Sequence, residues 1–276
     1  MDNSSFILLY WRKEQKEFKK NFEILRSRPD KNAVHDIRVS IKKLRACLKL
    51  YSLIGEKDKW QTLFTETKKL FSILGKERDI EVCIELISGY EQESGENLIF
   101  IKDDLKLQLR QNQRWSQEVI KKYTGKELAK IEYIFKQDTS LSQKEWIEKT
   151  IDCINSLLQE IKKYYKKPHQ TRKILKDIYY WIKMLPEDSI DNASFEKEIN
   201  KMLDDFGNWQ NDEILLMLIK HFRKDYLPVP IPEYDSFKTF EKKIEEKKER
   251  ILKAVIHKTK QLPKKISLVI IKKAIQ

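Results

Sequence analysis

Apolar residues recur every three or four positions along almost the whole chain, the spacing that places them on one face of an α-helix. Stretches that keep this spacing run for roughly 12 to 30 residues. The breaks between them fall at 27–30, Gly55, Gly75, 94–95, Gly125, 138–142, Pro168, Pro186, Gly207 and 227–232. Gly75 and Gly207 lie inside otherwise helical stretches, so a kink or a helix junction fits them as well as a loop. We therefore predict an all-α protein.

The predicted helix over residues 33–51 combines much apolar surface with six basic side chains and a single acidic one. Projected at about 100° per residue, five of the basic residues share an arc about 80° wide that contains no carboxylate. They are His35, Arg38, Lys42, Arg45 and Lys49. Apolar positions border this arc on both sides, whereas Asp36 and Lys43 fall where we expect solvent.

Solvated helix faces are the usual reason for a run of charge, but they normally mix signs and pair acids with bases four residues apart. Like charges along one face repel each other, so the partner of this arc is expected on another helix or outside the protein. We interpret the arc as one wall of an anion-binding groove.

The same pattern returns in the second half of the chain. His169, Arg172, Lys176, Tyr179 and Lys183 keep the offsets of the five residues of the first arc, again beside an apolar stripe. Residues 74–87 also resemble residues 206–219. We therefore predict two related helical bundles, residues 1–125 and 126–276, arranged about a pseudo-two-fold axis with their basic arcs facing each other.

The second half is less basic than the first. Tyr179 aligns with Arg45, Asp177 with Lys43, and Gln210 with Arg78. Whether both halves contact a ligand equally is therefore left open.

Composition narrows the class of partner. A net charge of +13 and a pI near 9.3 indicate a polyanion, and charge alone does not choose among nucleic acid, an acidic membrane surface and polymeric phosphate. The three cysteines are odd in number, far apart and in apolar surroundings, which favours free thiols in the cytoplasm. No targeting segment or apolar run of the roughly 20 residues that span a bilayer is evident, so no membrane partner is expected.

Two motifs of the first half resemble the CHAD family, named for a conserved histidine in an α-helical domain. They read His35-x-x-Arg38-Val39-x-x-x-Lys43-Leu44-Arg45 and Leu74-Gly75-x-x-Arg78-Asp79-x-x-Val82. The second half resembles the weaker second repeat, with His169, Arg172, Lys176 and an aromatic residue at Tyr180, and the resemblance spans roughly residues 4 to 260. The Glu-x-Glu-x-Lys signature of the triphosphate-tunnel domain, to which some members are fused, is absent, so we expect a standalone member.

This resemblance implies two four-helix bundles around a basic central pore or groove that binds inorganic polyphosphate, in the cytoplasm or on polyphosphate granules. Arginine and lysine at helical spacing suit such a ligand, because they place donors about every 5 Å along a repeating phosphate chain. The residues expected to bind polyphosphate are His35, Arg38, Lys42, Arg45, Lys49, Arg78, His169, Arg172, Lys176 and Lys183. Further candidates are Lys43, Lys106, Arg110, Arg114 and Tyr180.

Several of these residues have a second interpretation. His35 and His169 lie near helix N-termini, which favour anions, but such histidines are as often caps or core hydrogen-bonding groups. Arg78 is either a phosphate ligand or a structural ion-pair partner of Asp79. The stripe formed by Lys106, Arg110 and Arg114 is either solvated or part of the pore.

Catalytic and metal-binding motifs are missing from the sequence. The four histidines show no His-x-x-x-His spacing, and no Cys-x-x-Cys pair, phosphate loop, nucleophile elbow or Asp/Glu cluster appears. We therefore predict a non-catalytic polyphosphate-binding module without a metal or cofactor. RNA binding by the same surface is the alternative, although it favours a broad patch with interleaved aromatic residues. A phosphohydrolase is a third possibility, but it lacks a visible carboxylate set for a metal.

Overall fold

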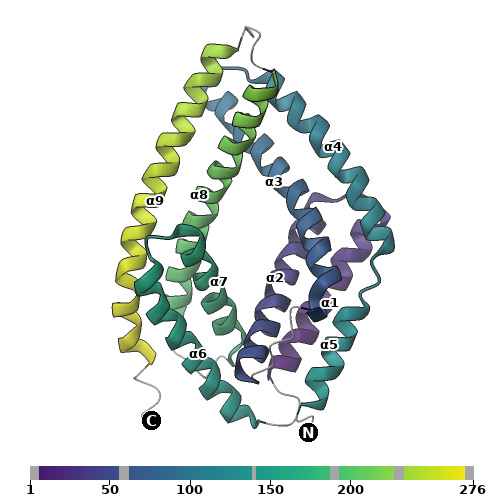
Figure 1. Ribbon diagram of the computed structural model, residues 1–276, viewed down its shortest axis with the longest axis vertical. Helices are drawn as coiled ribbons and strands as arrows, with labels where there is room; N and C mark the ends of the chain where they lie inside the picture. The colour runs from purple at the N-terminus through teal and green to yellow at the C-terminus, as the bar shows by residue number, and fades with distance from the viewer. Residues whose placement is uncertain (1–5, 56–61, 139–140, 187–192, 227–232, 271–276) are drawn as a thin grey trace.

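A computed structural model describes residues 6–55, 62–138, 141–186, 193–226 and 233–270. These residues form nine α-helices and no strand, which confirms the all-α prediction (Figure 1). The helices are α1 (Phe6–Ser27), α2 (Lys31–Ile54), α3 (Thr65–Ser94), α4 (Ile99–Lys122), α5 (Lys126–Gln137), α6 (Gln143–Tyr164), α7 (Pro168–Met184), α8 (Ala193–Tyr226) and α9 (Tyr234–Ile270). Within the described ranges, no helix is both long enough and apolar enough to cross a membrane.

Most of the predicted breaks mark real helix ends. The Asp30 carboxylate caps α2 by accepting a hydrogen bond from the backbone N–H of Ala33 at 2.9 Å. Gly95 and Gly125 have φ angles of 72° and 68°, a left-handed conformation that glycine adopts without strain, and they end α3 and precede α5. The break at 227–232 and residues 139–140 lie outside the described residues.

Gly75 and Gly207 do not interrupt their helices. α3 and α8 continue through them for 30 and 34 residues in total, the longest helices after α9. A single interior glycine costs a helix only about 1 kcal/mol relative to alanine, which packing along a long helix readily offsets.

The neighbours of corresponding helices match in the two halves. In the first half, α2 packs on α1 and α3, and α4 packs on α3 and α1; in the second, α7 packs on α6 and α8, and α9 packs on α8 and α6. This correspondence is what two four-helix bundles related by a pseudo-two-fold axis require. α5 follows the expected boundary at residue 125 and packs on α1; the boundary itself stays a prediction.

A large apolar core joins the two halves where α2 meets α7. Trp181 of α7 is completely buried, and its indole N–H donates to the carbonyl oxygen of Ala46 on α2 at 3.0 Å. Lys49 of α2 forms an ion pair with Asp177 of α7 at the same contact. Because these interactions link residues far apart in sequence, they fix the two basic helices relative to each other.

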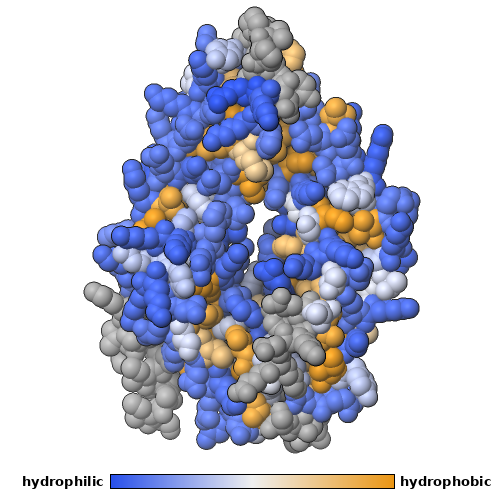
Figure 2. All heavy atoms as spheres, viewed as in Figure 1, coloured by the Kyte–Doolittle hydropathy of each residue, from blue (hydrophilic) through white to orange (hydrophobic). Residues whose placement is uncertain are grey.

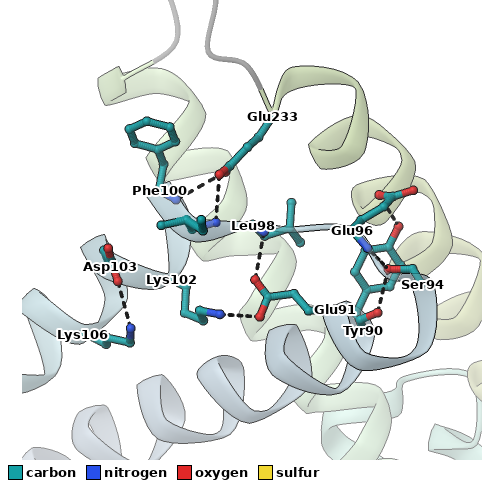
Figure 3. Close-up of polar contacts among 11 residues, drawn as sticks. Tyr90, Glu91, Ser94, Glu96, Leu98, Phe100, Lys102, Asp103, Lys106 and Glu233 are labelled. Carbon is teal, nitrogen blue, oxygen red and sulfur yellow. Dashed lines mark hydrogen bonds and ion pairs between the residues drawn. The ribbon is translucent and has the colours of Figure 1, made fainter.

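A second, smaller core lies at the other end of the molecule, between α3 and α4 on one side and α8 and α9 on the other. The Glu233 carboxylate, just before α9, accepts hydrogen bonds from the backbone N–H groups of Ile99 and Phe100 at 3.1 and 3.3 Å (Figure 3). It thereby caps α4 of the other half. Glu91 adds a hydrogen bond from the Leu98 N–H at 2.9 Å.

The cysteines are distributed over these cores. Cys47 lies in the larger core and Cys83 in the smaller one, and Cys153 is half-buried. All three are free, as predicted.

The two cores leave an opening between them. Figure 1 shows α2 and α3 on one side of the central gap and α7 and α8 on the other. The space-filling view in Figure 2 shows that the molecule is hollowed there and that hydrophilic residues surround most of the opening. The helices that carry the two predicted basic arcs therefore border this opening.

Candidate functional site

Six basic side chains from three helices lie close enough together beside the opening for their charges to act on one another. They are Arg38, Lys42 and Arg45 of α2, Arg78 of α3, and Arg172 and Lys176 of α7. We call these six residues the basic cluster. The prediction that the two halves bring their basic arcs together is correct for this part of each arc.

The two lysines of the basic cluster respond most strongly to this crowding. Burial, followed by the charges of Arg38, Arg172 and Arg45, lowers the pKa of Lys42 to about 8. Burial, followed by the charges of Arg172 and then Lys42, lowers the pKa of Lys176 to about 7. Positive charge is therefore unfavourable in the empty site, which is the condition under which an entering anion gains most.

Asp79 is the acidic group that opposes this charge. Burial raises the pKa of Asp79, while the charges of Arg38, Lys42, Arg172 and Arg78 lower it. Among the described residues, no cation comes within ion-pair distance of the Asp79 carboxylate. Asp79 acts at longer range, and Glu81 and Glu85 pair only with Arg78 among the six residues, so the basic cluster keeps an excess of positive charge.

Arg38 is held in place by α3. Its Nη1 donates to the carbonyl oxygen of Phe71 at 2.8 Å, and its guanidinium lies over the Phe71 ring, 4.5 Å from the centroid. A β-carbon on Gly75 would overlap this same Nη1. Gly75 therefore provides the room that the Arg38 guanidinium occupies, a role that was not predicted from the sequence.

Arg172 has an equivalent anchor in the second half. Its Nη1 donates to the side-chain carbonyl oxygen of Gln210 on α8, while its Nε is buried and has no hydrogen-bond partner in the described part of the chain. Tyr180 lies nearby on α7, and burial raises its pKa to about 12, with the charges of Arg172 and Arg45 acting in the opposite direction. Tyr180, a further candidate, thus borders the basic cluster.

A small pocket adjoins the basic cluster between α2 and α3. Its lining residues are Ile41, Lys42, Arg45, Phe64, Lys68 and Phe71. Lys68 and Phe71 were not predicted as site residues. Their position depends on the packing of α3 on α2, for which the sequence carries no direct signal.

The two histidines differ in their surroundings. His35 lies at the surface, but partial burial of its ring, then the charges of Arg78 and Lys42, lower its pKa. It therefore lies at the edge of the basic cluster. His169 is also exposed, but its ring packs on Trp209 with centroids 4.7 Å apart.

Three predicted lysines are engaged by carboxylates instead of joining the basic cluster. Lys43 lies 3.0 Å from the buried Glu14 of α1, so the expectation that it faces solvent is wrong. Lys49 pairs with Asp177 and Lys183 with Glu196. The reason is the same in each case: a helix packed alongside supplies an acceptor that the sequence of the basic helix does not reveal.

Arg78 forms structural ion pairs, but with other carboxylates than the predicted Asp79. Its Nη1 lies 3.5 Å from a carboxylate oxygen of Glu81 and 3.7 Å from one of Glu85, so its ion pairs are with these residues and not with Asp79. Its charge nevertheless acts on His35 and Arg38.

The stripe on α4 is remote from the basic cluster. Lys106 pairs with Asp103 at 2.9 Å, and Arg110 and Arg114 are exposed. α4 packs on α3 and α1 and runs along the outer edge of the molecule (Figure 1). The structure does not bring these three residues to the opening.

No group of three histidine, cysteine or acidic side chains within the described ranges is arranged to hold a metal ion. The basic cluster instead brings six cationic side chains together on helices that border the opening, and Arg38 and Arg172 are held there by hydrogen bonds. This arrangement suits binding of an anion with several charges.

Comparison with known proteins agrees with this architecture. The crystal structure of the CHAD domain from the plant Ricinus communis superimposes with a TM-score of 0.73 at 12% sequence identity, covering 94% of this chain and 93% of that one. PptA from Streptomyces chartreusis gives a TM-score of 0.65 at 12% identity, covering 93% and 97%. Both share the fold. A search of curated proteins found no match. The family model for the CHAD domain matches residues 10–220, and the chain therefore belongs to the CHAD domain family.

Proposed function

We propose that this protein binds inorganic polyphosphate in its central opening without catalysing a reaction on it. The observation that carries the proposal is the basic cluster, in which six cations from both halves lie close together and only Arg78 forms ion pairs among the described residues. Polyphosphate is a flexible chain with a negative charge on each internal unit, so several cations in one opening engage it simultaneously.

The held positions of Arg38 and Arg172 support the same ligand. Each guanidinium is anchored by a neutral oxygen acceptor, Phe71 and Gln210 respectively, and so keeps its charge uncompensated. Preorganised guanidinium groups lose little freedom when they bind phosphate oxygens. We propose that the protein acts in the cytoplasm. Its role there is either to associate with polyphosphate granules or to regulate a response to polyphosphate.

Titration calorimetry at low salt with long-chain polyphosphate tests the proposal. The wild-type protein is expected to bind with a dissociation constant of about micromolar or lower, and the affinity is expected to fall steeply with salt because counterions are released. The variant R38Q/K42Q/R45Q removes three charges from the basic cluster and is expected to lose about 1000-fold or more in affinity, at about 1.5 kcal/mol for each lost contact.

The matched control is K16Q/K19Q/K20Q, which removes the same charge from exposed positions of α1. It is expected to change affinity less than about threefold, because distant surface charges are screened. Equal losses in the two variants would show that net charge alone attracts the ligand. Absence of binding by folded wild-type protein would refute the proposal, and tighter binding of RNA in direct competition would favour the nucleic-acid alternative.

A further inference from the structure

Lys42 and Lys176 differ from the other lysines of the two basic arcs. Lys43, Lys49 and Lys183 each reach a carboxylate. Lys42 and Lys176 are half-buried, and their ammonium groups have neither an ion-pair nor a hydrogen-bond partner among the described residues. They come from opposite halves, and the charge of Lys42 acts on Lys176.

The helices that carry or face these lysines present mostly positive charge to them. The groups concerned are His35, Arg38 and Arg45 on α2, Lys68, Arg78 and Asp79 on α3, and Arg172 with the phenol of Tyr180 on α7. Asp79 is the acidic member of this set.

The remaining neighbours of α2 and α7 do not supply a free counter-charge. On α1, Glu14 is paired with Lys43. The residues that α6 buries are uncharged. On α8, Gln210 holds Arg172, Glu196 pairs with Lys183, and Asp205, Asp212 and Glu213 pair with lysines of α9. Asp204 of α8 is exposed, and its charge acts on Tyr179.

We infer that the opening takes up protons together with polyphosphate, and that Lys42 and Lys176 receive them, so that affinity for the anion falls as the pH rises above neutrality. The inference rests on the proposed function, because the phosphate charge is what stabilises the protonated lysines. Arginine at these positions would stay protonated at any physiological pH. Lysine at these two positions can lose its proton near neutral pH, so the charge of the ligand-free site changes with pH.

The size of the uptake follows from the protonation of the empty site. With pKa values lowered to about 8 and about 7, both lysines are partly deprotonated at pH 7.5, Lys176 more than Lys42. Phosphate oxygens beside both ammonium groups favour the charged forms. Complete protonation in the complex therefore takes up about one proton per protein chain, and linkage makes affinity decrease with pH in this range.

Calorimetry at pH 7.5 in HEPES and in Tris at equal ionic strength measures the number of protons that the protein takes up when polyphosphate binds. The two buffers give different heats when they supply a proton, so the difference between them reports this number. The wild-type protein is expected to take up about one proton per protein chain when polyphosphate binds. The variant K42R/K176R is expected to take up almost no protons when it binds polyphosphate, whatever its affinity, because both arginines are already protonated. K16R/K20R, which changes exposed lysines of α1, is the control and should match the wild type. The terminal phosphates of the ligand contribute equally in all three proteins.

The outcomes separate the inference from the proposed function. Binding without proton uptake, or equal uptake by K42R/K176R, would overturn the inference and leave polyphosphate binding intact. Absence of binding at both pH 6.5 and pH 7.5 would overturn both. Circular dichroism checks folding, and if the double variant does not fold, K176R alone serves, since it is expected to remove the larger part of the uptake at pH 7.5.

Discussion

α2 and α7 carry the same spacing of polar residues, yet they contribute differently to the opening. α2 places Arg38, Lys42 and Arg45 in the basic cluster, whereas α7 places Arg172 and Lys176 there. The last lysine of each arc is bound to a carboxylate. The difference shows that helical spacing selects which residues share a face, while acceptors on neighbouring helices select which of them keep a free charge.

The glycines of α3 and α8 repeat this asymmetry. Gly75 leaves space for the Arg38 guanidinium, whereas a β-carbon on Gly207 would meet no atom within 4 Å. The two aligned glycines thus have different functions. Arg38 is held by the Phe71 carbonyl of α3, close to Gly75, whereas Arg172 is held by the Gln210 side chain of α8.

The largest effect on polyphosphate affinity is expected when Gly75 is replaced by alanine, with the same change at Gly207 as the comparison. In G75A, the new methyl group displaces the Arg38 guanidinium, and polyphosphate affinity is expected to fall about 10-fold, the loss of about 1.5 kcal/mol from one charged contact. In G207A, affinity should stay unchanged and the free energy of unfolding should rise by about 0.5–1 kcal/mol, because alanine favours the helix. Calorimetry and urea unfolding measure the two quantities. Wild-type affinity in G75A would show that the position of Arg38 is unimportant.

A smaller effect is expected when Lys42 or Lys176 is replaced in the protein without polyphosphate. Because the unfolded chain binds more protons than the folded one between about pH 7 and pH 10.5, these lysines make the free energy of unfolding rise with pH in that window. K176M should therefore raise the melting temperature at pH 6.5 by about 2–4 °C and flatten its rise toward pH 9. K42M should do the same to a lesser degree, since its pKa is less lowered.

Melting curves at pH 6.5, 7.5 and 9 without polyphosphate provide the measurement. A K176M protein that melts lower than wild type by the same amount at every pH would mean that Lys176 contributes packing and no electrostatic repulsion.

The smallest effect concerns the paired lysines. Asp177 is 18% exposed and Glu196 is 32% exposed, so the ion pair of Lys49 is the less solvated of the two. Double-mutant cycles are expected to give a coupling free energy of about 1 kcal/mol for K49A/D177A and about half that for K183A/E196A. Polyphosphate affinity should change less than about twofold for K49A and K183A. A larger loss of polyphosphate affinity in either variant would show that the lysine concerned does bind the ligand.

Much of the fold was predictable because the responsible patterns are local. The boundaries of α2 followed from Asp30 and Gly55, and the turn after α3 from Gly95. The roles of Gly75 and Phe71 were not predictable, since both depend on where the Arg38 guanidinium lies relative to a different helix.

The amino-acid sequence alone determines the helical content, the two aligned arcs of basic residues and the membership of the CHAD domain family, since these depend on periodicity and motifs along one chain segment. The packing of the helices selects the members of the basic cluster. Ion pairs and hydrogen bonds act over a few ångströms, and their acceptors Glu14, Asp177 and Glu196 come from helices whose distance from the basic arcs is set only when the two cores form.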